Sequence, residues 1–421
     1  MATTSPRSIT TAEYRKIMVY SHDAFGFGNI RRMLAICNYL LKHIPNLSIL
    51  LISGSPILHD FRLPSGLYFI NLPCLNRGQS GIAVKYLNAD IKSTLKLRSQ
   101  VILAAARNYQ PDLVLVDKKP MGIQGELQST IEYLKSNLPV TKLVLLLRDI
   151  LNAPEKTIAE WQRENYYRQV ESLYDRILVV GMQQIFDLVR EYQFGKAIAD
   201  KVHYCGYIRK ESGLKNRRTI RQELGIGKNE KLVLVTPGGG EDGYCLVNNY
   251  LQGVVQQSKC FWDRNIRTLI FCGAEMPHQH QQQLAQQAQG LPGVTVKEFT
   301  NDLMSYVNTA DLVVSMCGYN TITEVLQKGK KAIVIPRIKP GREQLIRAQS
   351  MAQAGLIEMI HPEALEPDLL IETIFVGLTS PESSAKIGSL DFSGLPQVTN
   401  YLTALLYSFH NNEKPLIIQS F

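Results

Sequence analysis

The chain has 421 residues, of which 45% are hydrophobic and 20% are charged, as in an ordinary globular protein. Its length predicts two or three domains, and its short apolar runs argue against a membrane-spanning helix, which needs roughly 20 apolar residues. The formal net charge of +9 favours anionic partners such as phosphorylated substrates. The sequence carries no nucleic-acid-binding motif, so nucleic acid is not an expected partner.

The N-terminus and the cysteines bear on localisation. Residues 1–15 are rich in Thr and Ser without an apolar segment, which predicts a flexible leader and not a signal peptide. The seven cysteines form neither a CxxC pair nor a metal-binding spacing with His, so we expect free thiols and no metal site. We therefore expect a cytoplasmic protein, and peripheral contact with the inner face of a membrane stays open.

Short runs of Val, Ile and Leu alternate with amphipathic helical segments, which is typical of buried parallel strands joined by helices. Strands are expected at residues 16–20, 48–53, 112–117, 142–148 and 176–180, and in a second series at 231–236, 267–272, 294–298, 311–315 and 331–336. Each series opens with a strand, a glycine-containing turn and a helix. The pattern predicts an α/β protein with two doubly wound, Rossmann-like domains.

A polar and basic stretch between the two series marks the expected domain junction. We expect a leader at residues 1–15, an N-terminal domain at 16–212, a C-terminal domain at 213–400 and a C-terminal helix or tail at 401–421. Ligands of such sheets bind beyond the carboxyl ends of the strands. The expected site is therefore a cleft in which the two domains face each other.

The first candidate binding segment is the glycine-rich turn of Gly238, Gly239 and Gly240, which follows a strand and precedes a helix. Glycine lets the backbone approach a phosphate closely, and the start of a helix offers free N–H groups. The nearby Asp242 is a candidate N-cap of that helix. A tight turn that binds no ligand is the alternative.

The second segment, residues 310–324, is predicted as a strand that ends in Gly318 and a helix that begins near Asn320 or Thr321, either of which could cap it. Glu324 then falls in the first helical turn, where its charge suits the helix dipole. A carboxylate there can accept hydrogen bonds from two vicinal ribose hydroxyls. A capping contact of Glu324 with the backbone is the alternative.

The third segment carries Arg337, Lys339 and Arg342 after the strand at 331–336, and a helix is expected to begin near Arg342. Cations and helix N–H groups at one strand end suit a phosphate or a polyhydroxylated sugar. A solvated basic turn without a ligand is the alternative for this segment.

Three strand ends of the N-terminal half carry polar residues: His22 and Asp23, Lys118 and Lys119, and Arg148 and Asp149. Parallel strands place such residues on one rim of the sheet. A histidine beside a carboxylate can act as a general base near neutral pH, so His22 and Asp23 are the catalytic candidates. A merely exposed His22 is the alternative.

With these motifs in order, the C-terminal half resembles the nucleotide domain of GT-B glycosyltransferases, in the group of the bacterial peptidoglycan glucosaminyl transferase (MurG-like). The whole chain looks like a bacterial family of predicted glycosyltransferases, on the motifs SHDAFGFGNIRRML, LVDKKPMGIQGEL, LRDI and PRIKPGREQLIRA. The resemblance implies that Glu324 holds ribose and that residues 238–240 face a diphosphate. It also implies a donor site that includes Gly318, Asn320, Thr321, Arg342, Glu343 and Gln344.

The chain departs from the related enzymes at Asn29, where they usually have His. An amide cannot take a proton at neutral pH, so Asn29 is expected only to orient the substrate. The general base is therefore expected to be His22 or Asp23, at the end of the first strand. Gly28, Asn29, Lys118, Lys119 and Arg148 are expected on the acceptor side.

The expected activity is inverting, metal-independent transfer of a sugar from a nucleotide-diphosphate sugar to a hydroxyl of a small-molecule, glycan or lipid-linked acceptor. A UDP-sugar is the expected donor, and no separate cofactor is expected. Since the sequence has no DxD motif, helix ends and basic side chains would stabilise the leaving diphosphate. The alternatives are a sugar-nucleotide epimerase of the same fold and a non-catalytic module that binds sugar nucleotides or polyanions.

Overall fold

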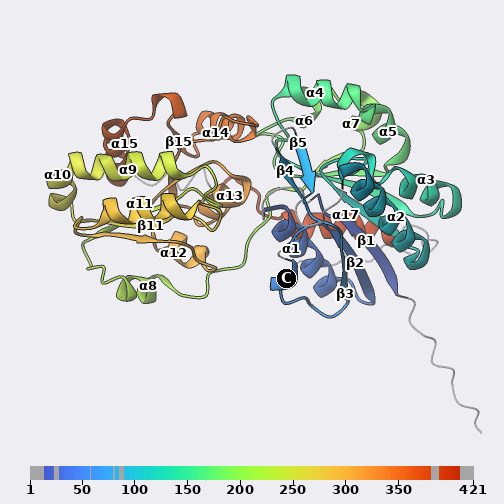
Figure 1. Cartoon of the computed structure of the whole chain (residues 1–421), viewed down its shortest axis with the longest axis horizontal. Helices are drawn as coiled ribbons and strands as arrows, with labels where there is room; N and C mark the ends of the chain where they lie inside the picture. Colours follow the sequence, from blue (N-terminus) through green and yellow to red (C-terminus); the bar gives the residue numbers. More distant parts are fainter. Residues whose placement is uncertain are drawn as a thin grey trace, which may run out of the picture.

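The structure is a computed structural model that describes residues 14–22, 28–56, 58–78, 81–84, 90–380 and 388–407. Figure 1 shows two lobes side by side, each a sheet covered by helices. The N-terminal half of the chain forms one lobe, and most of the C-terminal half forms the other.

The N-terminal lobe contains a parallel sheet in the order β3-β2-β1-β6-β7-β8-β9. Its central strands are runs of Val, Ile and Leu that are buried because helices cover both faces. A separate antiparallel hairpin pairs β4 (Leu75–Gly78) with β5 (Gly81–Val84). The strands of the sheet are β1 (Arg15–Tyr20), β2 (Leu47–Ser53), β3 (Leu67–Asn71), β6 (Leu113–Asp117), β7 (Lys142–Arg148), β8 (Arg176–Val180) and β9 (Val202–Tyr204).

The C-terminal lobe repeats this architecture with a parallel sheet in the order β12-β11-β10-β13-β14-β15. In both sheets the strand order reverses beside the first strand, between β1 and β6 and between β10 and β13. Such a reversal leaves a crevice at the carboxyl ends of the two strands, where ligands of doubly wound sheets bind. The strands are β10 (Lys231–Thr236), β11 (Ile266–Phe271), β12 (Val294–Lys297), β13 (Leu312–Ser315), β14 (Lys331–Val334) and β15 (Glu358–Met359).

Every strand expected from the sequence is present, with small differences at the ends. Strands β3, β9 and β15, which lie at sheet edges, were not predicted, whereas β12 at another edge was. The three missed strands are only partly covered, so they lack the continuous apolar run that marks a central parallel strand. The predicted α/β, doubly wound fold class is confirmed.

Helices connect the strands of both lobes. In the N-terminal lobe they are α1 (Gly28–His43), α2 (Ile91–Tyr109), α3 (Gln128–Asn137), α4 (Pro154–Arg163), α5 (Tyr166–Leu173), α6 (Leu188–Glu191) and α7 (Lys196–Ala199). Those that follow are α8 (Arg217–Glu223), α9 (Tyr244–Gln256), α10 (Ser258–Asp263), α11 (His278–Ala288), α12 (Leu303–Thr309), α13 (Tyr319–Gln327), α14 (Glu343–Gln353), α15 (Pro367–Thr379) and α17 (Gly394–Tyr407).

The last helix, α17, returns to the N-terminal lobe and packs on α1 (Figure 1). It begins at Gly394, earlier than the helix or tail expected from residue 401. Backbone hydrogen bonds fix the place where the chain returns to the N-terminal lobe. The Tyr207 N–H donates to the carbonyl oxygen of Asp391 at 2.8 Å, and the Tyr207 carbonyl oxygen accepts from the Gly394 N–H at 3.0 Å. The chain therefore passes between the lobes twice.

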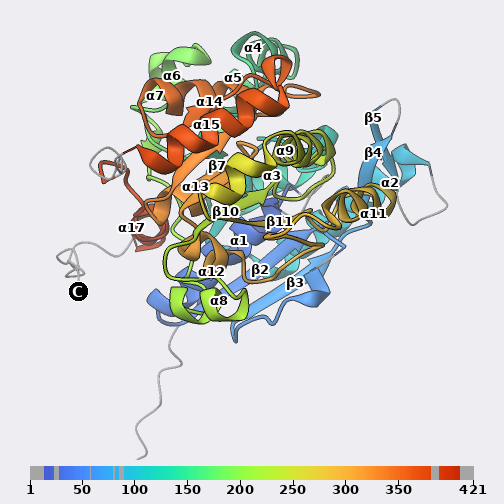
Figure 2. The ribbon, with the colours of Figure 1, turned by 90° about the vertical axis from the view of Figure 1, so that its left-hand side faces the viewer.

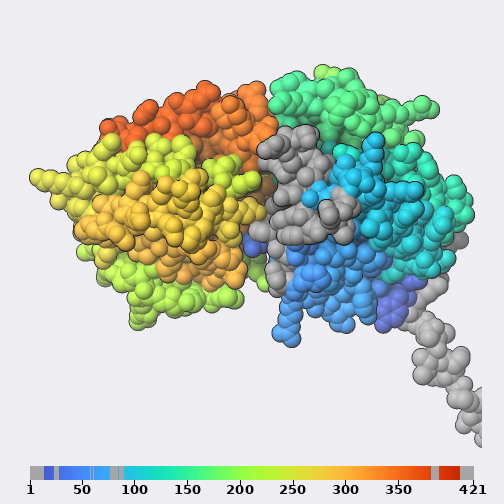
Figure 3. All heavy atoms as spheres, in the orientation of Figure 1, coloured from blue at the N-terminus to red at the C-terminus, as the bar shows by residue number. Residues whose placement is uncertain are grey.

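The two lobes meet along a central seam, and the carboxyl-end rims of both sheets contribute to it. Figure 3 shows orange atoms of the C-terminal lobe against green atoms of the N-terminal lobe at the top of this seam. Figure 2, viewed from the C-terminal side, shows the β4–β5 hairpin projecting at one edge. None of the helices in the described part of the chain is both long and apolar enough to span a membrane.

Candidate functional site

The loop after β1 is held by side chains of α1 and β6. His22 is 5% exposed, and its carbonyl oxygen accepts a hydrogen bond of 2.6 Å from Asn29 Nδ2. The His22 N–H donates to Asp117 Oδ2 at 3.3 Å, and Asp117 Oδ1 accepts a bond of 2.7 Å from Arg32 Nη2. In this structure the amide of Asn29 therefore fixes the backbone of the catalytic candidate.

The His22 imidazole is neutral at physiological pH. Burial, together with the cations Lys118, Lys119 and Arg148, holds its pKa well below the usual value. Its Nδ1 is buried and has no hydrogen-bond partner within the described ranges. A neutral ring with a free nitrogen has the protonation state of a general base, and its low pKa makes that base weak. Asp23, the other catalytic candidate, lies outside the described residues.

The basic residues predicted on the acceptor side differ in their surroundings. Lys119 forms an ion pair of 2.6 Å with Glu160. Lys118 follows β6, and its N–H donates to the carbonyl oxygen of Leu146 in β7 at 2.9 Å. Burial, reinforced by Arg148, lowers the pKa of Lys118 to about 8, and burial with neighbouring guanidinium groups lowers the pKa of Arg148. Both shifts show cations held close together at the ends of β6 and β7.

The glycine-rich turn after β10 packs closely against its own lobe. Gly238 and Gly240 have φ angles of +88° and +97°, which favour glycine. A Cβ atom on Gly240 would lie 2.3 Å from the carbonyl oxygen of Cys272, so packing alone demands glycine there. A Cβ atom on Gly238 would lie 3.0 Å from Thr321 Oγ1, which brings the turn beside the start of α13.

Asp242 does not cap the helix that follows this turn, so that prediction is wrong. Helix α9 begins at Tyr244 with Gly243 as its N-cap. The Asp242 carboxylate instead lies 3.5 Å from Arg337 Nη1, in the loop after β14. Asp242 therefore lies one residue before the N-cap, and its carboxylate pairs with a guanidinium instead of the helix N–H groups.

Helix α13 starts directly after the loop that follows β13. Gly318 is its N-cap, so neither Asn320 nor Thr321 caps it as predicted. Asn320 instead reaches across the seam, where its Nδ2 lies 3.4 Å from the carbonyl oxygen of Gly28 at the start of α1. A Cβ atom on Gly318 would meet nothing within 4 Å, so there is open space beside this helix end.

Helix α13 begins at Tyr319, one or two residues earlier than predicted, so Glu324 lies in its second turn and not in its first. Its carboxylate is 7% exposed and forms an ion pair of 2.6 Å with Lys210 Nζ. The backbone of Lys210 is fixed to Gln327 by two hydrogen bonds of 2.8 and 2.7 Å. A lysine from the segment between the lobes therefore holds the carboxylate, and the predicted alternative of a backbone cap is wrong.

The start of α14 gathers the three residues expected near the donor sugar. Helix α14 begins at Glu343 with Arg342 as its N-cap, so its predicted start near Arg342 is confirmed, and the Arg342 N–H donates to Asn152 Oδ1 of the N-terminal lobe at 3.1 Å. Glu343 forms an ion pair of 2.7 Å with Arg337, and Gln344 Oε1 accepts from the Arg337 N–H at 3.2 Å. Burial would raise the pKa of Glu343, but the Arg337 guanidinium lowers it overall.

A buried ion pair between the lobes was missed from the sequence. Arg347 of α14 donates to both carboxylate oxygens of Asp149 at 2.7 and 2.8 Å, and to the carbonyl oxygen of Cys317 at 2.8 Å. Both side chains of the pair are 1% exposed. Asp149 was recognised as a rim residue, but the spacing of charges along α14 gave no sign of a partner in the other lobe.

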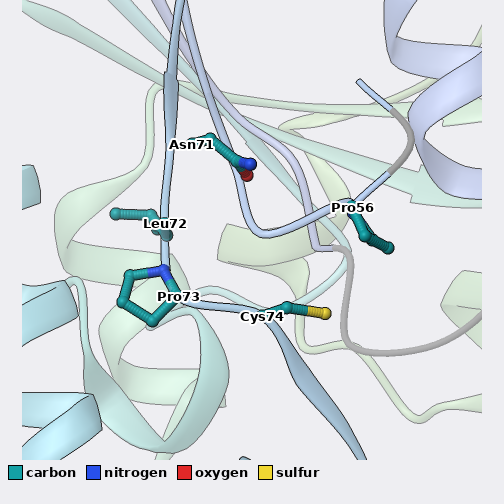
Figure 4. Close-up of a pocket in the computed structure, with 5 residues that line it drawn as sticks. All are labelled: Pro56, Asn71, Leu72, Pro73 and Cys74. Atoms are coloured by element: carbon teal, nitrogen blue, oxygen red, sulfur yellow. The ribbon is translucent and has the colours of Figure 1, made fainter. Parts of the chain in front are cut away.

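A hollow of about 530 Å³ lies beside the seam in the N-terminal lobe. It is lined by Pro56, Asn71, Leu72, Pro73 and Cys74, as Figure 4 shows. These residues follow β2 and β3, so the hollow lies on the rim that also carries His22. One wall is fixed because Arg98, bound to the buried Glu126, donates to the carbonyl oxygen of Pro73 at 2.7 Å.

The site as a whole joins two polar rims. The N-terminal rim offers a neutral imidazole and cations, while the C-terminal rim offers two helix starts, a glycine turn and a buried carboxylate. Within the described ranges, no group of three or more His, Cys, Asp or Glu side chains is arranged to hold a metal ion. Such a site suits a phosphorylated, hydroxyl-rich ligand that contacts both lobes.

Comparison with protein families identifies the C-terminal rim. Residues 245–388 match the family described as Glycosyltransferase family 28 C-terminal domain. The matched span includes all of α13 and α14, which carry Glu324 and the residues at 343–344. The C-terminal half carries a family 28 glycosyltransferase domain. The predicted resemblance of this half is thereby confirmed.

Curated relatives are named UDP-N-acetylglucosamine--N-acetylmuramyl-(pentapeptide) pyrophosphoryl-undecaprenol N-acetylglucosamine transferase. The protein from Acetivibrio thermocellus is 24% identical over 356 residues, which cover 82% of this chain and 85% of the relative. The protein from Bacillus cytotoxicus is 27% identical over 165 residues, or 39% of this chain. This chain spans only 42% of the Bacillus cytotoxicus protein and 36% of two Vibrio relatives.

Solved structures share the fold over nearly the whole chain. MurG of Acinetobacter baumannii has a TM-score of 0.60 at 15% identity, covering 93% of this chain and 99% of that chain. The UDP-GlcNAc 2-epimerase of Neisseria meningitidis, bound to UDP-GlcNAc, has a TM-score of 0.60 at 14% identity, covering 94% and 100%. The predicted GT-B architecture is confirmed, and it is common to transferases and epimerases.

Proposed function

We propose that the chain is a glycosyltransferase that moves a sugar from a nucleotide-diphosphate sugar to an acceptor hydroxyl. The observation that carries this proposal is the family 28 match across α13 and α14, the two helices that start at the cleft-facing rim of the C-terminal sheet. The activity named for the curated relatives is of the same kind.

The donor nucleotide would bind to the C-terminal rim. Glu324 would accept hydrogen bonds from the ribose hydroxyls, and its buried carboxylate makes such charge-assisted bonds strong. The diphosphate would lie between the turn of residues 238–240 and the open start of α13 at Gly318, where free N–H groups and the helix dipole favour anions. Arg342 and Gln344 would then lie beside the donor sugar.

Catalysis would take place where the two rims meet. His22, whose lowered pKa keeps the imidazole neutral, would take the proton of the acceptor hydroxyl as that oxygen attacks the anomeric carbon. The bond between that carbon and the diphosphate breaks at the same time, which inverts the configuration. Helix N–H groups and basic side chains would stabilise the charge on the leaving diphosphate without a metal ion.

A UDP-sugar is the proposed donor, and the acceptor is a small molecule, a glycan or a lipid-linked compound. The relatives' names include a UDP-sugar donor and an undecaprenol-linked acceptor. A cytoplasmic enzyme with peripheral membrane contact would fit such an acceptor. Co-sedimentation with liposomes of anionic phospholipid at low and high salt tests this contact, and recovery in the supernatant at both salts would contradict it.

The activity is tested by incubating the protein with UDP-, GDP-, ADP- and dTDP-sugars in EDTA and measuring the release of nucleoside diphosphate. We expect Glu324→Gln to weaken binding of the preferred nucleotide about tenfold or more, because a charged acceptor of two hydrogen bonds is lost. The matched control is Glu372→Gln, at an exposed position of α15. Equal nucleotide affinity in wild type and Glu324→Gln would refute the assigned site.

The shared fold keeps a sugar-nucleotide epimerase as the second candidate. An epimerase changes the sugar of a single substrate and leaves it attached to the nucleotide. Conversion of a UDP-sugar to its epimer without release of UDP, followed by mass spectrometry and NMR, would favour that activity. Nucleotide binding with neither epimerisation nor transfer would favour the non-catalytic binding module.

A further inference from the structure

The charges around the N-terminal rim do not balance locally. Four carboxylates near this rim each have a cation as partner: Asp117 with Arg32, Asp149 with Arg347, Glu160 with Lys119 and Glu343 with Arg337. Two further cations, Lys118 and Arg148, form no ion pair or side-chain hydrogen bond with any described residue. They are unmatched positive charges among the described residues of the rim.

The fold holds these two cations side by side. Strands β6 and β7 pair in parallel with Asp117 opposite Leu146, so Lys118 and Arg148 lie at the carboxyl ends of adjacent strands, whose backbones are about 4.8 Å apart. The charge of Arg148 helps to lower the pKa of Lys118, so the two cations are close together. Lys118 has a φ of +69°, a left-handed backbone conformation that a lysine rarely adopts.

Two buried nitrogen atoms, one in the pair and one beside it, have no hydrogen-bond partner in the part of the chain that the structure describes. They are Nε of Arg148 and Nδ1 of His22, whose side chain is 5% exposed. Buried polar groups without hydrogen bonds are rare in proteins and call for a ligand or water. The electrostatic neighbours of the pair include His22 on its own rim and Glu343 at the start of α14 on the other. The unmatched charges therefore adjoin the place where donor and acceptor would meet.

We propose that Lys118 and Arg148 form a subsite for an anionic group of the acceptor, a phosphate or a carboxylate close to its attacking hydroxyl. This proposal rests on the glycosyltransferase function proposed above and adds a substrate class to it. A guanidinium binds two oxygen atoms in a fork and an ammonium adds a point charge, a combination that recognises such groups. A neutral acceptor would leave both cations and the two nitrogen atoms unsatisfied.

The position of the pair assigns the anion to the acceptor and not to the donor. Both cations belong to the N-terminal rim, whereas the residues proposed for ribose, diphosphate and donor sugar lie on α13, α14 and the turn after β10. The pair adjoins His22, the proposed base, which must contact the acceptor hydroxyl. An acidic group on the donor sugar is the other source of an anion, and the experiment separates the two.

The experiment measures binding by isothermal titration calorimetry, with and without saturating UDP. The probes are glycerol 3-phosphate and free glucuronate, each paired with its neutral counterpart, glycerol and glucose. The variants are Lys118→Gln and Arg148→Gln, and Lys118→Arg tests whether charge alone restores binding. The controls Lys156→Gln and Arg168→Gln remove exposed cations from α4 and α5 of the same lobe.

We expect one or both anions to bind the wild type and their neutral counterparts not to bind. Each glutamine variant should weaken anion binding roughly tenfold to a hundredfold, as for the loss of a charged hydrogen bond. Lys118→Arg and both controls should stay within threefold of the wild type, and the affinity for UDP should be unchanged in all variants.

Three results would overturn the proposal. Anion binding that survives both glutamine variants, or falls equally in the controls, would show that the pair is not the subsite. UDP-glucuronate and UDP-glucose are titrated as well, and weaker binding of UDP-glucuronate to the glutamine variants, with UDP-glucose unaffected, would assign the anion to the donor sugar. A wild type that does not bind UDP would instead refute the proposed function, while loss of anion binding in Lys118→Gln would still identify a site.

Discussion

Removing the carboxylate of the buried ion pair between the lobes should destabilise the protein strongly. In Asp149→Asn the side chain keeps its shape but loses the charge that accepts two bonds from Arg347. Arg347 is then left buried and charged beside neutral acceptors, which are the amide oxygen introduced at position 149 and the carbonyl oxygen of Cys317. Arginine cannot shed its proton. Burial alone would lower the pKa of Arg347, but the charge and hydrogen bonds of Asp149 raise it overall in the intact protein.

The expected loss in the free energy of unfolding follows from how deeply Asp149 and Arg347 are buried. Both side chains are 1% exposed, so the charge left behind cannot be hydrated. Breaking a buried pair by removing one partner typically costs about 3–5 kcal/mol. Replacing both partners removes the stranded charge, so Asp149→Asn with Arg347→Met should cost clearly less than the sum of the single changes.

Urea unfolding followed by circular dichroism measures these free energies, with all four proteins of the cycle compared. The control is Glu223→Gln, which breaks an exposed ion pair of 2.7 Å with Lys215 and should cost about 1 kcal/mol or less. A loss in Asp149→Asn no larger than that of the control would refute the reasoning. Additive single changes would likewise show that the two side chains are not coupled.

Three other changes test the site by different measurements. Lys210→Met leaves the buried Glu324 carboxylate without its ammonium, and we expect the free energy of unfolding in urea to fall by about 1–3 kcal/mol; no change would refute the contact. Gly240→Ala places a Cβ atom 2.3 Å from a carbonyl oxygen and should lower the melting temperature more than Gly225→Ala, which has the same kind of backbone strain in open space; equal shifts would contradict the close packing. Since the pKa of Lys118 is lowered to about 8, its ammonium is present below pH 8 and lost above it. Affinity for glycerol 3-phosphate should therefore fall as the pH rises through 8, and Lys118→Arg should abolish that fall; a flat wild-type profile from pH 7 to 9.5 would count against the subsite.

The central strands were predictable because a strand buried on both faces must be apolar along its whole length. This rule located β1, β6 and β7 in one lobe and β10, β13 and β14 in the other, together with the polar residues that follow them. Since parallel strands end on one rim, the rim residues could be grouped before any coordinates were known. The edge strands β3, β9 and β15 were missed because they are partly covered and lack this continuous apolar run, although β12, also at a sheet edge, was predicted.

Contacts between residues far apart in the chain could not be predicted from the sequence. Lys210 and Glu324 are 114 positions apart and Asp149 and Arg347 are 198 apart, and local spacing carries no information on either pairing. Capping was misjudged for a related reason. Asp242 has the chemistry of an N-cap, but an ion pair with Arg337 draws it away from the helix. Tertiary contacts decided these roles and local propensity did not.

The buried pair also bears on how the cleft can open. Arg347 lies one turn beyond Glu343 on α14, and Asp149 directly follows Arg148 on the opposite rim, so the pair ties the proposed donor-sugar and anion sites together. Separating the lobes along α14 would expose two charges and break two short hydrogen bonds. The contact between Asn320 and Gly28 is a single bond of 3.4 Å and is much weaker. Opening for substrate entry should therefore begin beside α13 and α1, while the edge along α14 acts as the hinge.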